Sequence, residues 1–244
     1  LMQLMKRNEN GLSLPSCFVK DYPNFQWRGL HLDVARHFFT VEEIKRFIDL
    51  MSYYKFNTFH WHLTDDQGWR IEIKKYPKLT EIGSWRDSTV DNHYTTVPRT
   101  YTKARYGGFY TQEQIKDVVA YAEAKYVTIV PEIEMPGHAR AALAAYPEYS
   151  CTGKAQGVEG LWGIFDDIFC SKPASIQFLK DILDEVIPLF PGQYIHIGGD
   201  EAPKTRWHSC PKCQDIMKEN HLKDEHELQS YFIRQMDAYV TAKG

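Results

Sequence analysis

Hydrophobic and polar positions follow two different periods along this chain. Four short runs are rich in apolar, aromatic and β-branched residues and predict strands at Gly29–Asp33, Thr58–Leu63, Val127–Glu132 and Tyr194–Ile197. Longer amphipathic segments predict helices at Val41–Lys55, Gln112–Lys125, Pro173–Leu189 and Glu225–Ala242. Strands that alternate with helices in this way are typical of parallel sheets joined by right-handed crossovers.

The helix starts and the connections refine this prediction. Thr40 is followed by Glu43 and Thr111 by Gln114, which is the spacing of a capping box. Helix-to-strand connections are short, whereas the strand-to-helix connections at residues 64–110 and 133–172 are long. Functional sites of β/α proteins lie at the carboxyl ends of the strands, where these long loops leave. The pattern fits a doubly wound sheet or part of a (β/α)8 barrel, and four units cannot close an eight-stranded barrel.

Composition excludes several classes of protein. The chain has 244 residues, 43% of them hydrophobic, which is enough for one globular domain with a sizeable core. Its 29 basic and 32 acidic residues are interleaved, so no nucleic-acid partner is expected. No apolar run approaches the roughly 20 residues of a membrane span. The opening LMQLMKRNENG lacks the apolar core of a signal peptide and is typical of the end of a helix from a preceding segment.

The five cysteines do not predict a metal site. Cys210 and Cys213 form one C-x-x-C pair, and no second such pair or His pair at the usual spacing supplies the about four ligands that zinc requires. Cys151 and Cys170 flank a single irregular stretch. A disulfide between these two is an option in an oxidising compartment, and two buried free thiols are the alternative.

Charged and histidine side chains follow every predicted strand at the same end. They are Asp33 and Arg36 after the first strand, His60, His62, Asp65 and Asp66 at the second, Glu132, Glu134 and His138 at the third, and Asp200 and Glu201 at the fourth. Each alone has a structural explanation, such as an ordinary ion pair or a packed, hydrogen-bonded histidine. Together, under long loops rich in Trp and Tyr, they predict a catalytic or sugar-binding pocket.

Two chemistries suit such a pocket. Metal-assisted hydrolysis would use His60 and His62 as ligands beside Asp65 or Glu132. Carbohydrate hydrolysis would use carboxylates as acid and base, with aromatic rings covering the apolar face of the sugar. The aromatic residues near the strand ends favour the second chemistry, and they include Trp61, Trp69, Trp85 and Trp162.

The adjacent carboxylates Asp200 and Glu201 do not fit the usual retaining scheme. Neighbouring residues in an extended segment point to opposite sides. Two catalytic carboxyl groups of a retaining glycosidase face each other about 5 Å apart across the anomeric carbon. The nucleophile is therefore expected to come from somewhere other than this pair. Gly198 and Gly199 would let the backbone bend and bring the substrate close.

Four segments, in order, resemble the catalytic domain of the family 20 glycoside hydrolases, the β-N-acetylhexosaminidases: RGLHLDVARHFF, NTFHWHLTDDQGWR, PEIEMPGH and HIGGDE. The resemblance implies an α/β fold of the (β/α)8 TIM-barrel type, with residues 22–244 as its N-terminal half and residues 1–21 as a remnant of an upstream segment or linker. It also implies exo-hydrolysis, with retention, of terminal β-linked N-acetylglucosamine or N-acetylgalactosamine. The substrate's own 2-acetamido oxygen would be the nucleophile.

The resemblance also implies roles for individual residues. Glu201 is similar to the general acid and base, and Asp200 to the residue that orients the acetamido N–H and stabilises the charged intermediate. His138 would keep the acid protonated. Arg36 and Asp65 would help to hold the terminal sugar. Glu134 would support His138 through a direct contact, at a position where the family often has aspartate. His196 would also support the site.

The same resemblance sets expectations for the whole protein. In the family, the rest of the barrel supplies the Trp and Tyr residues around the acetamido group, so the partner expected besides the carbohydrate substrate is the remaining half of the barrel. A half barrel with two open edges is expected to be unstable, oligomeric or prone to aggregation, with weak or no activity alone. No cofactor or metal is implied. A periplasmic, secreted or lysosome-like compartment is favoured for the parent protein.

Overall fold

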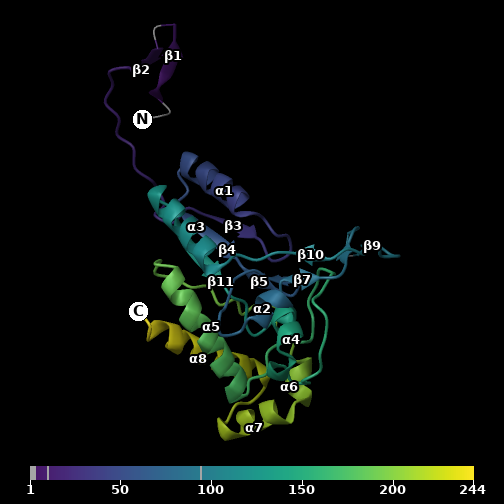
Figure 1. The fold of residues 1–244 in the computed structure, drawn as a ribbon. Helices are drawn as coiled ribbons and strands as arrows, with labels where there is room; N and C mark the ends of the chain where they lie inside the picture. Colours follow the sequence, from purple (N-terminus) through teal and green to yellow (C-terminus); the bar gives the residue numbers. More distant parts are fainter. Residues whose placement is uncertain (1–3, 10, 94) are drawn as a thin grey trace.

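Three parallel strands form the centre of the molecule. The computed structural model describes residues 4–9, 11–93 and 95–244. Strands β3 (Gly29–Asp33), β4 (Thr58–His62) and β11 (Thr128–Glu132) pair in parallel with β4 in the middle (Figure 1). Each agrees with its predicted strand to within a residue, which confirms the α/β class. The sheet is open, and the described residues form no closed barrel.

The fourth predicted strand, at residues 194–197, is an extended segment rather than a regular strand. It forms one parallel bridge, between His196 and Glu132. The His196 N–H donates to the Pro131 carbonyl at 2.9 Å, and the His196 carbonyl accepts from the Ile133 N–H at 3.0 Å. The segment therefore lies beside β11, as a fourth parallel strand would. The glycines at 198 and 199, with φ of +67° and +108°, turn the chain away immediately afterwards.

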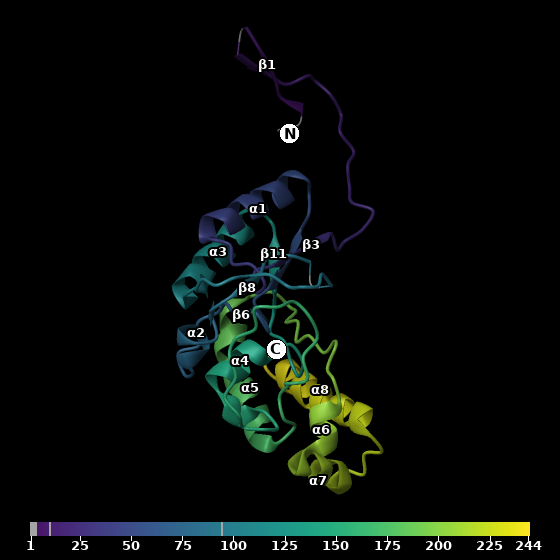
Figure 2. The same ribbon diagram turned by 90° about the vertical axis from the view of Figure 1, so that its right-hand side faces the viewer.

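The four predicted helices are present as α1 (Val41–Tyr53), α3 (Gln112–Ala124), α5 (Pro173–Val186) and α8 (Glu225–Thr241). Both predicted capping boxes form, at Thr40 and Thr111. α5 ends three residues early in a 3-10 turn, η3 (Ile187–Leu189), because Pro188 cannot donate the next helical hydrogen bond. α1 packs on α3 and α5 packs on α8 (Figures 1 and 2).

The long strand-to-helix connections contain short elements that the hydrophobic pattern did not predict. Three two-stranded antiparallel pairs join β5 (Thr64–Asp65) to β6 (Gly68–Trp69), β7 (Trp85–Arg86) to β10 (Tyr106–Gly107), and β8 (Thr89–Val90) to β9 (Tyr101–Thr102). The short helical segments are α2 (Lys78–Glu81), α4 (Arg140–Ala145), η2 (Pro147–Tyr149), α6 (Thr205–Ser209) and α7 (Pro211–Glu219).

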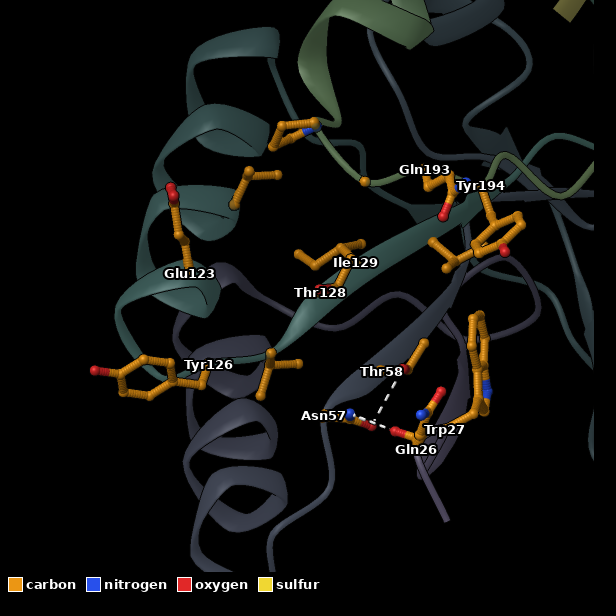
Figure 3. Close-up of a pocket in the computed structure, with 15 residues that line it drawn as sticks. Gln26, Trp27, Asn57, Thr58, Glu123, Tyr126, Thr128, Ile129, Gln193 and Tyr194 are labelled. Carbon is orange, nitrogen blue, oxygen red and sulfur yellow. Dashed lines mark hydrogen bonds between the residues drawn. The ribbon is translucent and has the colours of Figure 1, made fainter. Parts of the chain in front are cut away.

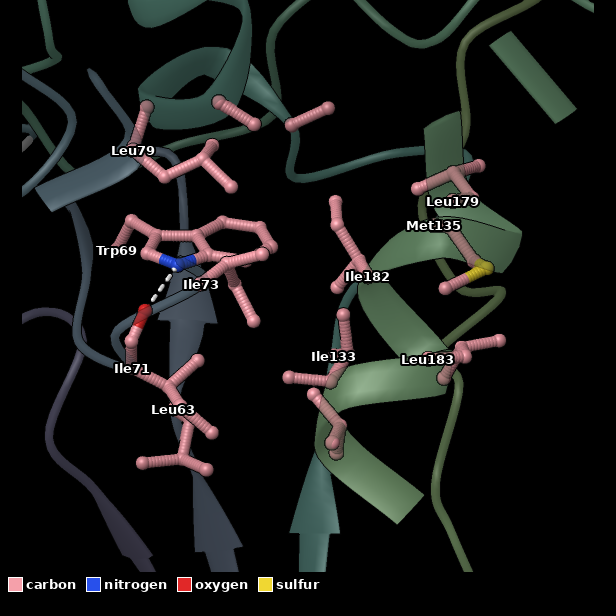
Figure 4. Close-up of a cluster of buried hydrophobic side chains, with 14 of the residues drawn as sticks. Leu63, Trp69, Ile71, Ile73, Leu79, Ile133, Met135, Leu179, Ile182 and Leu183 are labelled. Carbon is pink, nitrogen blue, oxygen red and sulfur yellow. Dashed lines mark hydrogen bonds between the residues drawn. The ribbon is translucent and has the colours of Figure 1, made fainter. Parts of the chain in front are cut away.

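The side chains of β4 divide between an apolar face and a polar face. Phe59 packs on Phe47 of α1, and Trp61 packs on Tyr110 and Phe190. Further along, Trp69 lies with Leu63 and Ile73 opposite side chains of α5 and of the segment that follows β11 (Figure 4). The intervening histidines of β4 therefore point to the other face of the sheet, as the two-residue period of a strand requires.

Residues before the sheet form a small exposed hairpin of β1 (Lys6–Asn8) and β2 (Gly11–Ser13), which both views place away from the body (Figures 1 and 2). The expected helix end is therefore wrong at these described residues, whereas residues 1–3 and 10 of that stretch lie outside the described residues. Gly11, the first residue of β2, has a φ of +114°, which favours glycine. None of the helices in the described ranges is long and apolar enough to cross a membrane.

Candidate active site

The parallel register aligns polar residues across the sheet at one level. Asp33 of β3 pairs with His62 of β4, and His62 pairs with Glu132 of β11. Glu132 in turn bridges to His196. We call these four residues the polar row. The polar cluster expected at the carboxyl ends of the strands is thus confirmed, because parallel strands in register bring their last residues side by side.

Glu132 is the centre of the polar row. Its Oε2 lies 2.6 Å from His60 Nε2 and 2.7 Å from His62 Nδ1, and its Oε1 lies 2.9 Å from His196 Nδ1. Burial opposes ionisation, but the hydrogen bonds to the three histidines hold the pKa of Glu132 well below its ordinary value. His62 is correspondingly charged: burial lowers its pKa, but the hydrogen bonds to Asp65 and Glu132 outweigh burial and raise it to about 10.

Asp65 joins the polar row to the next loop. Its side chain is fully buried, and its Oδ2 lies 2.6 Å from Arg36 Nη1 and 2.8 Å from His62 Nε2. Its Oδ1 lies 3.1 Å from His138 Nδ1 and accepts from the Asp66 N–H. Burial raises the pKa of Asp65, but these partners outweigh burial and lower it to about 2. Arg36, also bonded to Asp33 at 3.1 Å, keeps a quarter of its side chain exposed.

His138 connects these buried carboxylates to the Asp200–Glu201 pair. Its Nδ1 lies 3.1 Å from both Asp65 and Asp66, and its Nε2 lies 3.4 Å from Glu201 Oε2 and 3.6 Å from Asp200 Oδ2. Burial lowers its pKa, but Asp65 and Asp66 outweigh burial and raise it to about 11. A cationic imidazolium stabilises negative charge around it. It therefore does not suit the expected role of keeping a neighbouring carboxylic acid protonated.

The turn at residues 198–201 presents its two carboxylates outward. The side chains of Asp200 and Glu201 are 61% and 51% exposed, in contrast to the buried carboxylates beneath them. Glu201 itself has a φ of +40°, in the left-handed region. The Gly199 carbonyl accepts a hydrogen bond from Gln229 Nε2 of α8 at 2.6 Å, which ties the turn to that helix. The pair is thus positioned on a fixed turn at the carboxyl end of the sheet.

Glu134 lies beneath this turn without the partner expected for it. It is 3% exposed, its Oε2 has no hydrogen-bond partner among the described residues, and none of its contacts is a hydrogen bond to His138. Asp66 supplies that support to His138 instead. Burial and the nearby charges of Glu132 and Asp200 raise the pKa of Glu134 to about 9. Any Cβ at Gly198 would overlap the Glu134 carboxyl group.

A buried arginine that the sequence did not indicate holds the backbone beside Arg36. Arg70 is fully buried, and its guanidinium donates to the carbonyl oxygens of Val34, Ala35, Ser84 and Gly108 at 2.6–3.0 Å. Arg86 donates to the Arg36 carbonyl at 2.9 Å. Arginines are mostly exposed, and neither carries a sequence signal for such a role. Both fix the backbone that presents Arg36.

The aromatic residues considered as sugar platforms do not all lie on the surface. Trp61 is fully buried and Trp69 is 2% exposed, so both belong to the hydrophobic core. Trp85 is half-buried and lies under the Arg105 guanidinium, whereas Trp162 is 52% exposed. Two of these four tryptophans are therefore core residues and cannot cover a sugar.

A pocket of about 720 Å³ lies at the opposite end of the sheet (Figure 3). Gln26, Trp27, Asn57, Thr128 and Tyr194 are among the residues around it. Asn57 and Thr128 stand at the amino ends of β4 and β11, and no member of the polar row lines the pocket. Its position distinguishes it from the candidate active site.

Several groups of side chains converge closely enough to hold a cation. One contains His60 and His62, the ligands of the alternative metal-assisted chemistry, together with His31 and Glu132. Both nitrogens of His62 already face carboxylates, which matches an ion-pair network. A second group consists of four cysteines. The disulfide considered between Cys151 and Cys170 is not formed, because both are free thiols that converge with two others.

Comparisons with known proteins agree with this geometry. The profile of the glycosyl hydrolase family 20 catalytic domain matches residues 25–244. The β-hexosaminidase of Porphyromonas gingivalis is 52% identical over 234 residues, and that of Vibrio furnissii is 43% identical over 248 residues. The alignments cover 96% and 100% of this chain but 29% and 40% of the two relatives.

Solved structures give the same result. The β-N-acetylhexosaminidase of Bacteroides fragilis has a TM-score of 0.84 and 42% identity, over 99% of this chain and 45% of that chain. A family 20 exo β-N-acetylglucosaminidase of Vibrio harveyi, solved with N-acetylglucosamine, has a TM-score of 0.84 and 42% identity, over 99% and 38% of the two chains. The chain spans less than half the length of each of these relatives. It belongs to glycosyl hydrolase family 20, and its residues 25–244 match that family's catalytic domain, which is of the TIM-barrel type.

Proposed function

We propose that this chain is the N-terminal half of the (β/α)8 catalytic domain of an exo-acting β-N-acetylhexosaminidase that hydrolyses terminal β-linked N-acetylhexosaminides with retention. The observation that carries the proposal is the turn after the fourth strand position, where Asp200 and Glu201 stand exposed above His138. The relatives named as β-hexosaminidases, and the Vibrio harveyi enzyme bound to N-acetylglucosamine, support the same substrate class.

The proposed mechanism is substrate-assisted. Asp200 and Glu201 are consecutive residues on one turn, so they do not face each other across a scissile bond as two catalytic carboxylates would. The substrate's 2-acetamido oxygen attacks the anomeric carbon while the leaving oxygen takes a proton from Glu201. Water, activated by the resulting Glu201 carboxylate, then opens the cyclic intermediate. Two inversions at the anomeric carbon give net retention.

Asp200 acts on the acetamido group in this proposal. Its carboxylate accepts the acetamido N–H, which turns the carbonyl oxygen toward the anomeric carbon. The same negative charge stabilises the positive charge that develops on the oxazolinium ring. Its exposure leaves it accessible to a substrate from the open end of the sheet.

The buried residues act by positioning. Asp65 is inaccessible, so it orients Arg36 and His138 rather than contacting the sugar itself. Arg36 remains partly exposed and is the residue of this group that binds sugar hydroxyls. His138 links Asp65 and Asp66 to the catalytic turn. Glu132 of the polar row holds His196, which lies two residues before that turn. Glu134 supports the turn through close packing against Gly198.

The test is hydrolysis of an aryl N-acetyl-β-glucosaminide beside the matching β-glucoside by a chain extended beyond Gly244, with a Glu201→Gln control. We expect turnover of the first substrate alone, because a 2-hydroxyl group cannot replace the acetamido nucleophile. Glu201→Gln should lower hydrolysis of a disaccharide substrate by about 10²–10⁴-fold. An aryl leaving group needs less protonation, so Glu201→Gln should lower hydrolysis of the aryl substrate by a smaller factor. Efficient cleavage of the glucoside would refute substrate assistance.

The same assay separates the function from the completeness of the barrel. We propose that the other half of the barrel is required, so the 244-residue chain alone should show weak or no turnover, and a chain extended beyond Gly244 should be active. Strong activity of a monomer of the short chain would contradict this requirement.

A metal-dependent hydrolase is less well supported, because both nitrogens of His62 face carboxylates. A non-catalytic sugar-binding protein would need neither Asp200 nor Glu201.

A further inference from the structure

Four cysteines from two different loops meet at one point outside the polar row. Cys151 and Cys170 belong to the connection between β11 and α5, and Cys210 and Cys213 lie at the start of α7. Their ligand atoms all lie within 4.8 Å of one another. We call this group the cysteine cluster. The fifth cysteine, Cys17, is exposed and takes no part in it.

We propose that the cysteine cluster is a structural zinc site in which four thiolates surround one Zn²⁺. The sulfur atom of Cys170 lies 3.6 Å from that of Cys213 and 3.9 Å from that of Cys210. The sulfur atoms of Cys151 and Cys213 lie 3.7 Å apart. In a tetrahedral site with zinc–sulfur bonds of about 2.3 Å, neighbouring sulfur atoms are about 3.8 Å apart. The observed separations therefore match the edges of such a tetrahedron.

The same distances do not single out a pair of disulfides. Bonded sulfur atoms lie about 2 Å apart, and each sulfur has one partner. Here Cys213 is almost equally near to Cys151 and to Cys170, and Cys170 is almost equally near to Cys210. Three of the four residues are buried and Cys151 is partly buried. Convergence of four thiols on one centre is the arrangement that a soft tetrahedral cation requires.

The surroundings suit thiolates. Cys210 occupies the N-cap position of α7 and Cys213 lies in its first turn, so two of the four thiols belong to the positive end of a nine-residue helix. The hydroxyl of Ser171, adjacent to Cys170, is buried and has no hydrogen-bond partner among the described residues. A thiolate could accept from it, as outer-shell donors do around metal ligands.

The cluster also has a structural task. The two loops that it joins carry His138 and the Asp200–Glu201 turn. Other contacts already place the loops together: Trp207 Nε1 donates to the Phe169 carbonyl at 2.9 Å, and Arg206 Nε donates to Asp167 at 3.0 Å. Zinc would lock this arrangement, and with it the short helices α6 and α7.

The first test is metal analysis of the unsubstituted protein, as a chain extended beyond Gly244 to include the other half of the barrel, purified with a mild reductant and without chelator. We expect about one equivalent of zinc per chain. Cobalt(II) exchanged into the site should give the intense visible spectrum of tetrahedral thiolate coordination. These measurements need no variant, so they do not depend on the folding of a mutated chain. Substoichiometric zinc together with no cobalt–thiolate spectrum would overturn the proposal, as would two disulfides found by mass analysis.

Variants then assign the ligands. Cys213→Ser should reduce zinc retention at least about tenfold, and Cys17→Ser is the matched control that should retain zinc fully. A chelator should lower the melting temperature of the control but leave that of Cys213→Ser unchanged, because only the control has a metal to lose. Equal zinc contents in the two variants would contradict the assignment. The measurement does not depend on hydrolase activity, so it stands apart from the proposed function.

Discussion

Glu134→Gln tests whether a carboxyl group beneath the catalytic turn is protonated in the folded protein. Glu134 is 3% exposed, and its Oε2 has no hydrogen-bond partner among the described residues. Burial and the charges of Glu132 and Asp200 raise its pKa from 4.5 to about 9. Glutamine has nearly the same shape and no charge, so the substitution removes the titration while keeping the packing against Gly198.

The magnitude follows from the two pKa values. Between the unfolded value of 4.5 and the folded value of about 9, the native state holds a proton that the unfolded state has released. The free energy of unfolding therefore falls as pH rises through this window, by about 1.4 kcal/mol per pH unit. The resulting penalty is about 1 kcal/mol near pH 5 and about 3 kcal/mol near pH 7. Glu134→Gln should not show this loss of stability, because glutamine does not titrate.

The assay is equilibrium urea unfolding of both proteins, followed by tryptophan fluorescence at several pH values. We expect the stability of Glu134→Gln relative to the unsubstituted protein to rise by about 2.5 kcal/mol from pH 5 to pH 7. Any difference between an amide and a carboxylic acid in packing is independent of pH and cancels in this comparison. Glu219→Gln, at an exposed site on α7, is the control and should show no such trend. A gap that stays constant with pH would refute the reasoning.

Two further substitutions probe the same region. Gly198→Ala should destabilise the protein by about 2 kcal/mol or more, because its φ is +67° and a Cβ would overlap the Glu134 carboxyl group. Gly157→Ala, where a Cβ meets nothing within 4 Å, should cost far less in the same thermal unfolding measurement, and equal losses would argue against the clash. Asp66→Asn removes one of the two carboxylates at His138 Nδ1, so the His138 pKa measured by NMR titration should fall clearly below about 11. The stability that this raised pKa provides is complete below pH 6.5 and is lost as pH rises through about 11. The stability difference between Asp66→Asn and the unsubstituted protein should therefore shrink at high pH. An unchanged His138 pKa would show that Asp65 alone holds the proton.

The sequence alone determined the local structure and the chemistry of the strand ends. Three strands, four helices and both capping boxes were predicted correctly, because each depends on periodicity or capping within a few residues. Asp33, His62 and Glu132 were predicted to cluster because the ends of parallel strands must lie side by side. Four motifs in order were sufficient to indicate the family, since each combines several functional residues at fixed spacing.

Only the tertiary structure decided which of those residues meet. Asp66 rather than Glu134 supports His138 because the loop after β4 contacts the loop after β11, where Asp66 also accepts from the Arg140 N–H. Trp61 and Trp69 became core residues because the helices cover that face of the sheet. The C-x-x-C pair found its two further cysteines about 40 and 60 residues upstream, where no local spacing rule applies. Contacts between distant segments depend on how whole elements pack, and neither periodicity nor spacing along the chain records that packing.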